Sequence, residues 1–123
     1  MQEKSVTGED LATISPLLAA VVSAVEDKKA QDVTWIDVRG RCGFTDFFVL
    51  ATGRTDRQLN AIAQSVSEAA HSHQLSAAIE GREAMEWLVI DLNDVVVHLF
   101  LSEVRDALQL ESLWRRPTAG AVA

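Results

Sequence analysis

Two short runs of apolar residues in the last third of the chain are separated only by Asn93-Asp94. The runs cover residues 87–92 and 95–101. Short apolar runs divided by an Asn/Asp pair are typical of a β-hairpin, because these residues tolerate the backbone conformation of a tight turn. We therefore expect two antiparallel strands here, joined at Asn93-Asp94.

Three further runs have strand character. Residues 47–52 are almost continuously apolar, which indicates a strand that is buried on both faces. Residues 33–38 form a shorter run rich in β-formers, and residues 77–80 form a weak one. With the hairpin, these runs predict five strands.

Helical periodicity and helix-start signals occur at three places. Ser15-Pro16 predicts a helix start, because serine caps helices and proline suits the first helical position. Thr55 and Gln58 have the spacing of a capping box. The helix that follows has an apolar face made of Leu59, Ile62, Ala63, Val66 and Ala70. Ser102 predicts the start of a last helix.

The predicted order of elements is α-β-β-α-β-β-β-α. A helix between strands implies a crossover with parallel pairing, whereas tight hairpins imply antiparallel pairing. The fold class is therefore α/β (α+β), with a mixed five-stranded sheet flanked by helices. We expect one domain over residues 13–114, with flexible segments at 1–12 and 115–123.

The charge balance restricts the class of partner. The chain has 123 residues, with 11 Lys and Arg against 18 Asp and Glu, which gives a net charge of −7. A length of this order suits one domain, and an acidic domain is repelled by phosphate backbones. We expect no direct readout of nucleic acid, and a basic protein is the more suitable partner.

Three observations bear on the compartment. Cys42 is the only cysteine, so no intrachain disulfide can form, which suits a reducing compartment. The first ten residues are polar and do not resemble a secretory signal. No apolar run has the length of a membrane span. We expect a soluble cytoplasmic protein without membrane contact.

The residues with metal or catalytic chemistry form no known pattern. His71, His73, His98 and Cys42 lack the spacing of zinc ligands. Gly53-Arg54-Thr55 precedes a helix but belongs to no glycine-rich phosphate motif. No predicted strand carries the two carboxylates, one residue apart, with which a nucleotidyltransferase holds metal. We expect no cofactor, no metal and no enzymatic activity.

The hairpin is the strongest candidate for binding. Alternation along its first strand places Trp87, Val89 and Asp91 on one face. Trp87 is either a core residue or an anchor inserted into a partner, because tryptophan is common at interface hot spots. This face, which is aromatic, apolar and acidic, suits a partner with an apolar pocket and basic residues.

The order and spacing of several motifs resemble the ribosomal silencing factors of the RsfS/Iojap family. The resemblance covers roughly residues 17–114. The segments that carry it are DKKAQD at 27–32, DVRG at 37–40, TDFFVLATG at 45–53, Arg57-Gln58, Ile62-Ala63, Glu80-Gly81, WLVID at 87–91, DVVVHLF at 94–100 and LESLW at 110–114.

The resemblance implies a fold similar to that of nucleotidyltransferases, without their activity. It implies binding to the large ribosomal subunit through its protein L-fourteen, which would block joining of the small subunit and repress translation under nutrient limitation. It also implies homodimers of the free protein. The implied partner-binding residues are Trp87, Leu88, Val89 and Asp91, with Glu80, Gly81, Glu86 and Asp94 as neighbours.

The chain departs from the family pattern at two points. Asn93 stands where a glycine is common in the hairpin turn, but asparagine also accepts a positive φ. The chain has no tyrosine, although relatives often carry one in the second strand. Two alternatives stay open: a nucleotidyltransferase-like nucleotide-binding module or enzyme, and an adaptor for some other basic protein.

Overall fold

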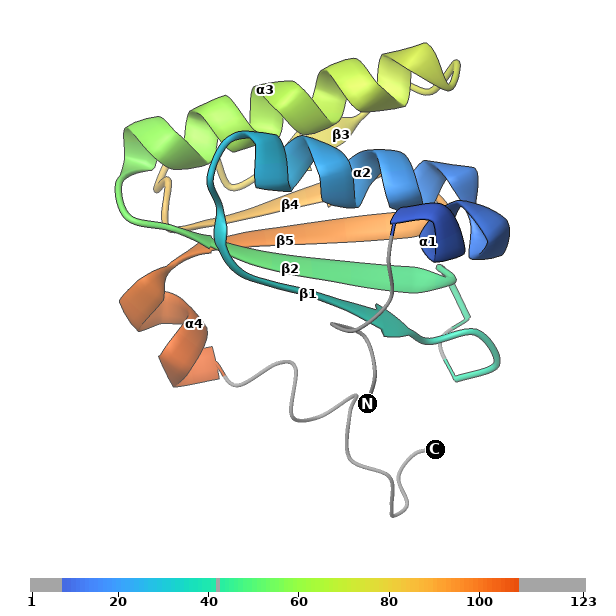
Figure 1. The fold of residues 1–123 in the computed structure, drawn as a ribbon. Helices are drawn as coiled ribbons and strands as arrows, with labels where there is room; N and C mark the ends of the chain where they lie inside the picture. Colours follow the sequence, from blue (N-terminus) through green and yellow to red (C-terminus); the bar gives the residue numbers. More distant parts are fainter. Residues whose placement is uncertain (1–7, 42, 109–123) are drawn as a thin grey trace.

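A mixed five-stranded sheet forms the centre of the molecule, with its strands in the order β1-β2-β5-β4-β3 (Figure 1). The computed structural model describes residues 8–41 and 43–108. The strands are β1 (Gln31–Asp37), β2 (Phe47–Gly53), β3 (Ala78–Glu80), β4 (Trp87–Asp91) and β5 (Val95–Leu101), and the helices are α1 (Gly8–Ile14), α2 (Pro16–Asp27), α3 (Asp56–Ser72) and α4 (Ser102–Leu108).

The pairing of the strands confirms the predicted mixed sheet. The central strands β2 and β5 are parallel, whereas β1 pairs with β2, β5 with β4, and β4 with β3 in antiparallel fashion. The parallel pair arises because α3 carries the chain across the sheet between β2 and β3, so that the β4–β5 hairpin can return to the centre. All seven residues of β2 are buried, as its continuous apolar character predicts.

The two faces of the sheet are covered unequally. Helices α1, α2 and α3 lie over one face, whereas α4 lies at one end of the other face (Figure 1). The larger core cluster lies on the helical side, and the predicted apolar face of α3, from Leu59 to Ala70, is fully buried there. A smaller cluster lies on the other side, around Phe48, Leu50 and Phe100.

The predicted helix starts are confirmed at Ser15 and Thr55. The Ser15 hydroxyl accepts a hydrogen bond from the Leu18 amide over 3.1 Å, and the Thr55 hydroxyl accepts one from the Gln58 amide over 3.1 Å. The reciprocal bond of the capping box differs from expectation, because the Gln58 side-chain oxygen accepts from the Arg54 amide at 2.8 Å. Gln58 therefore also fixes the backbone of Arg54, the residue before the N-cap Thr55.

The N-terminal boundary differs from the prediction of a flexible segment over residues 1–12. Helix α1 begins at Gly8, and Leu11 is buried in the larger core cluster. Among the residues of this helix whose burial is described, Leu11 is the one in the larger core cluster, so the segment shows no apolar face, and this short helix depends on its contact with α2. The predicted boundary at 114 and the flexible tail at 115–123 lie outside the described residues.

The part of the chain that the structure describes includes no helix that is long and apolar enough to cross a membrane.

Candidate functional site

Alternation along β4 separates its five residues between the two faces of the sheet. Leu88 and Ile90 are fully buried on the helical side, whereas Trp87 and Val89 are half-buried and Asp91 is exposed. The prediction that Trp87, Val89 and Asp91 share a face is therefore confirmed. Leu88 points into the helical core, and its assignment as a partner contact stays a prediction.

Strand register aligns the side chains of this face into rows. Trp87 lies opposite Phe100, Val89 opposite His98, and Asp91 opposite Val96. On the outer side of β4, Glu80 pairs with Val89 and Ala78 with Asp91. The face therefore changes from acidic at the β3 edge to aromatic at the centre of the sheet.

The Trp87 side chain is fixed by contacts with two residues of β5. Its indole Nε1 donates a hydrogen bond to His98 Nδ1 over 3.1 Å. Its ring stacks on Phe100, with 5.6 Å between ring centroids and an interplanar angle of 27°. Trp87 is thus a half-buried part of the face rather than a side chain that projects freely.

His98 lies between the aromatic rings of this face. Phe48 meets it edge-to-face at a centroid distance of 5.3 Å. Burial lowers the pKa of His98 to about 4, because the charged imidazolium loses its hydration. The ring is therefore neutral at pH 7, and its Nδ1 can accept the hydrogen bond from Trp87 Nε1. The alternation of β5 correctly indicates a face opposite to Val97 and Leu99, but it does not indicate the bond to Trp87.

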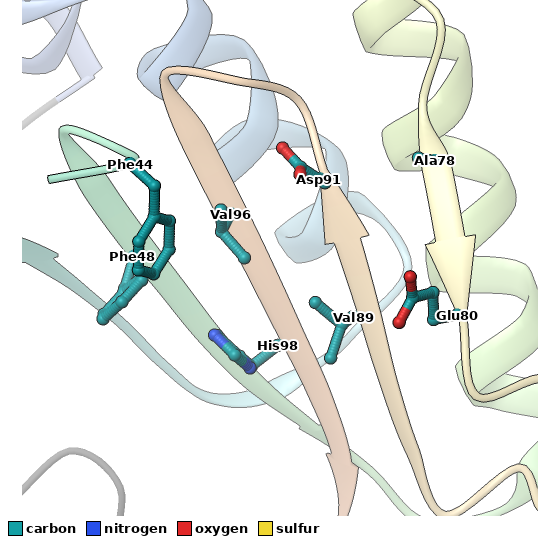
Figure 2. A pocket seen from close by; sticks show the side chains of 8 residues that line it. All are labelled: Phe44, Phe48, Ala78, Glu80, Val89, Asp91, Val96 and His98. Carbon is teal, nitrogen blue, oxygen red and sulfur yellow. The ribbon is translucent and has the colours of Figure 1, made fainter. Parts of the chain in front are cut away.

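A pocket of about 310 Å³ opens on this face beside His98 (Figure 2). Its lining comes from four strands and one loop and consists of Phe44, Phe48, Ala78, Glu80, Val89, Asp91, Val96 and His98. Figure 2 shows the aromatic rings on one side and the Asp91 and Glu80 carboxylates on the other. The pocket is therefore an apolar hollow with an acidic rim.

Phe44 is a member of this site that the sequence analysis missed. It is 68% exposed, and its ring lies 6.3 Å from that of Phe48. A phenylalanine beside a glycine, in a loop between two strands, was the available signal, since such a loop offers little apolar cover. Exposed aromatic residues of this kind are frequent at protein interfaces.

Helix α4 limits the accessible part of the face. The Arg105 guanidinium, under α4, donates to the Asp32 carbonyl and to the Thr52 hydroxyl, the latter over 2.8 Å. Val104 packs against the smaller core cluster. The hydrogen bonds of Arg105 lie over β1 and β2, and among the described residues none of α4 lines the pocket.

The remaining predicted site residues occupy different places. Gly81 has a φ of +98°, and a Cβ there would overlap the Trp87 carbonyl oxygen, so its function in the fold is to bring β3 close to β4. Glu86 precedes β4, and its carbonyl accepts from the Leu101 amide. Asp94 lies beyond the other end of β4, where its carbonyl accepts from the Phe47 amide. Glu86 and Asp94 therefore flank the hairpin at opposite ends.

The hairpin turn has the geometry expected of asparagine. Asn93 has a φ of +77°, and its amide donates to Asp91 Oδ1 over 2.8 Å. The side chain of Asp91 is thereby held at the end of β4, next to the pocket. The turn forms with Asn93 because asparagine accepts the left-handed conformation.

Within residues 8–41 and 43–108, no group of three or more His, Cys, Asp and Glu side chains is arranged to hold a metal ion.

The family model described as "Ribosomal silencing factor during starvation" matches residues 11–121. The ribosomal silencing factor of Halalkalibacterium halodurans is 38% identical over 99 residues, which cover 80% of this chain and 85% of that protein. The ribosomal silencing factor of Bacillus subtilis is 33% identical, and the alignment covers 80% of this chain and 84% of that protein.

Solved structures agree with these matches. A crystal structure of a protein from Chromobacterium violaceum superimposes with a TM-score of 0.79 at 32% identity. The alignment covers 89% of this chain and 93% of that one. A crystal structure from Bacillus halodurans gives a TM-score of 0.72 at 38% identity, over 80% of this chain and 93% of that one.

Proposed function

This chain belongs to the family of ribosomal silencing factors, and from that membership we propose that it binds the large ribosomal subunit through protein L-fourteen. Bound there, it blocks joining of the small subunit and represses translation under nutrient limitation. The protein acts in the cytoplasm as a regulator rather than as an enzyme. Its free form is a homodimer.

The observation that supports this proposal most directly is the open face around the pocket. Phe44, Trp87 and Val89 bring apolar surface to it, and Glu80 and Asp91 bring negative charge. An apolar centre with a charged rim is the usual composition of a protein interface. The acidic rim suits a partner with basic residues.

The rigidity of the face also supports a steric function. Trp87 and His98 are held by stacking and by a partly buried hydrogen bond, so little conformational entropy is lost when a partner covers them. A binding protein that acts as an obstacle needs only a stable footprint, and no movement of its own is required. The candidate contact residues are Phe44, Glu80, Trp87, Val89 and Asp91, with Glu86 and Asp94 at the periphery.

The test is co-sedimentation with separated large and small ribosomal subunits from the organism that encodes the protein. We expect the chain to pellet with large subunits only. Phe44→Asp places a charge in the proposed interface and is expected to weaken pelleting at least tenfold. Ile14→Asp is a matched control, because Ile14 is also an exposed apolar side chain, at 39%, but lies at the end of α1 on the helical side.

Subunit joining is measured in the same preparation by light scattering after the two subunits are mixed. The wild-type chain is expected to reduce the joined fraction, and Phe44→Asp to restore it. Pelleting with small subunits, or unchanged joining at saturating protein, would contradict the proposal. Equal effects of both substitutions would show that the open face is not the binding surface.

A further inference from the structure

The pocket combines apolar walls with negative charge on one side only. Phe44, Phe48, Val89 and Val96 form the walls, and the Glu80 and Asp91 carboxylates lie at the side nearest β3 and β4 (Figure 2). Such a site suits a ligand that is apolar along its length and positive at its end. Lysine and arginine side chains have this form, because an aliphatic stem carries their charged group.

The two carboxylates are placed to act together. Glu80 lies opposite Val89, and Asp91 is the next residue of β4 on the same face, so the two are diagonal neighbours on adjacent strands. Side chains at diagonal positions are within reach of one another across a sheet. Among the described residues that line the pocket, none is a lysine or an arginine.

The size of the pocket also restricts the occupant. A volume of about 310 Å³ lies at the lower end of the range found for small-molecule sites, about 300–1,000 Å³. One long side chain fits a hollow of this size, whereas a helix does not. A phosphate group is disfavoured, because it would meet the Glu80 and Asp91 carboxylates.

The contacts of Trp87 indicate which of the two proteins inserts a side chain into the other. Because its indole is bonded to His98 and stacked on Phe100, it is not free to enter a pocket of the partner. The hollow lies on this chain, so the inserted group comes from the other protein.

We propose that the pocket receives one lysine or arginine side chain of the protein partner, with its stem against Phe48 and Val96 and its charge between Glu80 and Asp91. This inference rests on the proposed function, because it takes the partner to be a protein of the large subunit. It specifies what the site recognises, a basic side chain of the partner, and the two carboxylates that recognise it, Glu80 and Asp91.

The test removes both charges while the shapes are kept. The double variant Glu80→Gln/Asp91→Asn retains an oxygen at position 91 that can accept from the Asn93 amide, so the turn is preserved. We expect its affinity for large subunits to fall at least tenfold at low salt. We also expect the decrease of affinity with added salt to be shallower than for the wild type, because fewer charges are paired.

Glu68→Gln is the matched control, since Glu68 is an exposed carboxylate on α3, over the opposite face of the sheet. It changes the net charge without changing the pocket and is expected to bind as the wild type does. Thermal melting of each variant checks that the fold is kept. A double variant that binds like the wild type at every salt concentration overturns the inference while the proposed function stands. If the wild type does not bind large subunits, both fail.

A carbodiimide cross-link distinguishes the two side chains. This reagent joins a carboxylate to a lysine amine at contact distance but does not join it to arginine. Cross-linked peptides that join Glu80 or Asp91 to one lysine of a large-subunit protein would support the inference and name the residue. Charge-dependent binding without such a peptide assigns an arginine. Cross-links of these carboxylates to several scattered lysines would overturn insertion of a single side chain.

Discussion

The indole Nε1 of Trp87 donates a hydrogen bond to Nδ1 of His98 across the β4–β5 hairpin, over 3.1 Å. The two residues are diagonal neighbours, because Trp87 lies opposite Phe100 and His98 lies opposite Val89. The bond requires a neutral histidine with its proton on Nε2. The position of the tryptophan on the open face therefore depends on the protonation state of a residue eleven positions further along the chain.

Substitution of Trp87 is expected to separate stability from binding. Trp87→Phe keeps an aromatic ring against Phe100 but leaves His98 Nδ1 without its donor, which we expect to cost about 1–2 kcal/mol of the free energy of unfolding. Trp87→Ala also removes the stacking and is expected to cost about 3 kcal/mol. Chemical denaturation measures both losses. Co-sedimentation at temperatures where both variants are folded measures binding, which Trp87→Ala should weaken by about 2 kcal/mol or more.

Stability is expected to fall as the pH is lowered from 7 to 4. The pKa of His98 is about 4 in the folded chain, against an ordinary value of 6.5. The unfolded chain therefore takes up a proton below pH 6.5, whereas the folded chain resists until about pH 4. Over this window the free energy of unfolding should decrease by up to about 3 kcal/mol, and the contribution of His98 should level off below pH 4.

Urea denaturation at several pH values checks this expectation. His98→Leu serves as the control, because leucine cannot titrate and leaves the other ionisable groups in place. The variant starts from a lower stability, since Trp87 Nε1 loses its acceptor, but its dependence on pH between 4 and 6.5 should be shallower. Parallel curves for the two proteins would show that His98 is not the group responsible.

Two glycines with positive φ provide a matched pair for backbone effects. Gly81 has a φ of +98° and no space for a Cβ beside the Trp87 carbonyl, whereas Gly40 has a φ of +81° and open space. Gly40→Ala should therefore cost about 1 kcal/mol from backbone strain alone. Gly81→Ala should cost more, about 3 kcal/mol, because the β3–β4 connection must move. Thermal denaturation of the two variants tests the difference, and equal losses would contradict it.

Gln58 is expected to stabilise the fold more than an exposed glutamine normally does. Its side-chain oxygen accepts from the Arg54 amide, and its nitrogen donates to the Lys28 and Lys29 carbonyls over 3.3 and 3.2 Å. Gln58→Ala removes these bonds and should cost about 1–2 kcal/mol. Gln64→Ala, on the exposed side of the same helix, should stay within about 0.5 kcal/mol of the wild type. Urea denaturation compares the two.

The strands and main helices were predictable because their signals are local. Alternation along residues 87–91, continuous apolar character over 47–52 and caps at Ser15 and Thr55 each depend on residues close in sequence. The mixed sheet followed from the order of these elements. Helix α1 was not predicted, because a single buried residue, Leu11, gives no local periodic signal.

The candidate site was predictable in part. The shared face of Trp87, Val89 and Asp91 follows from the geometry of one strand. The position of Phe44, by contrast, depends on how the loop between β1 and β2 approaches β5. No feature of the sequence near residue 44 specifies a neighbour more than forty positions away.

The sequence by itself determined the elements of this protein, the face on which each hairpin residue lies and the acidic character of the hairpin. The tertiary structure alone decided that Arg105 of α4 bonds to β1 and β2, that His98 is largely buried and neutral, and that the pocket lies on this chain. The physical reason is that alternation and capping act over a few residues. A pocket, a buried charge or a stacked pair exists only once distant strands are brought side by side.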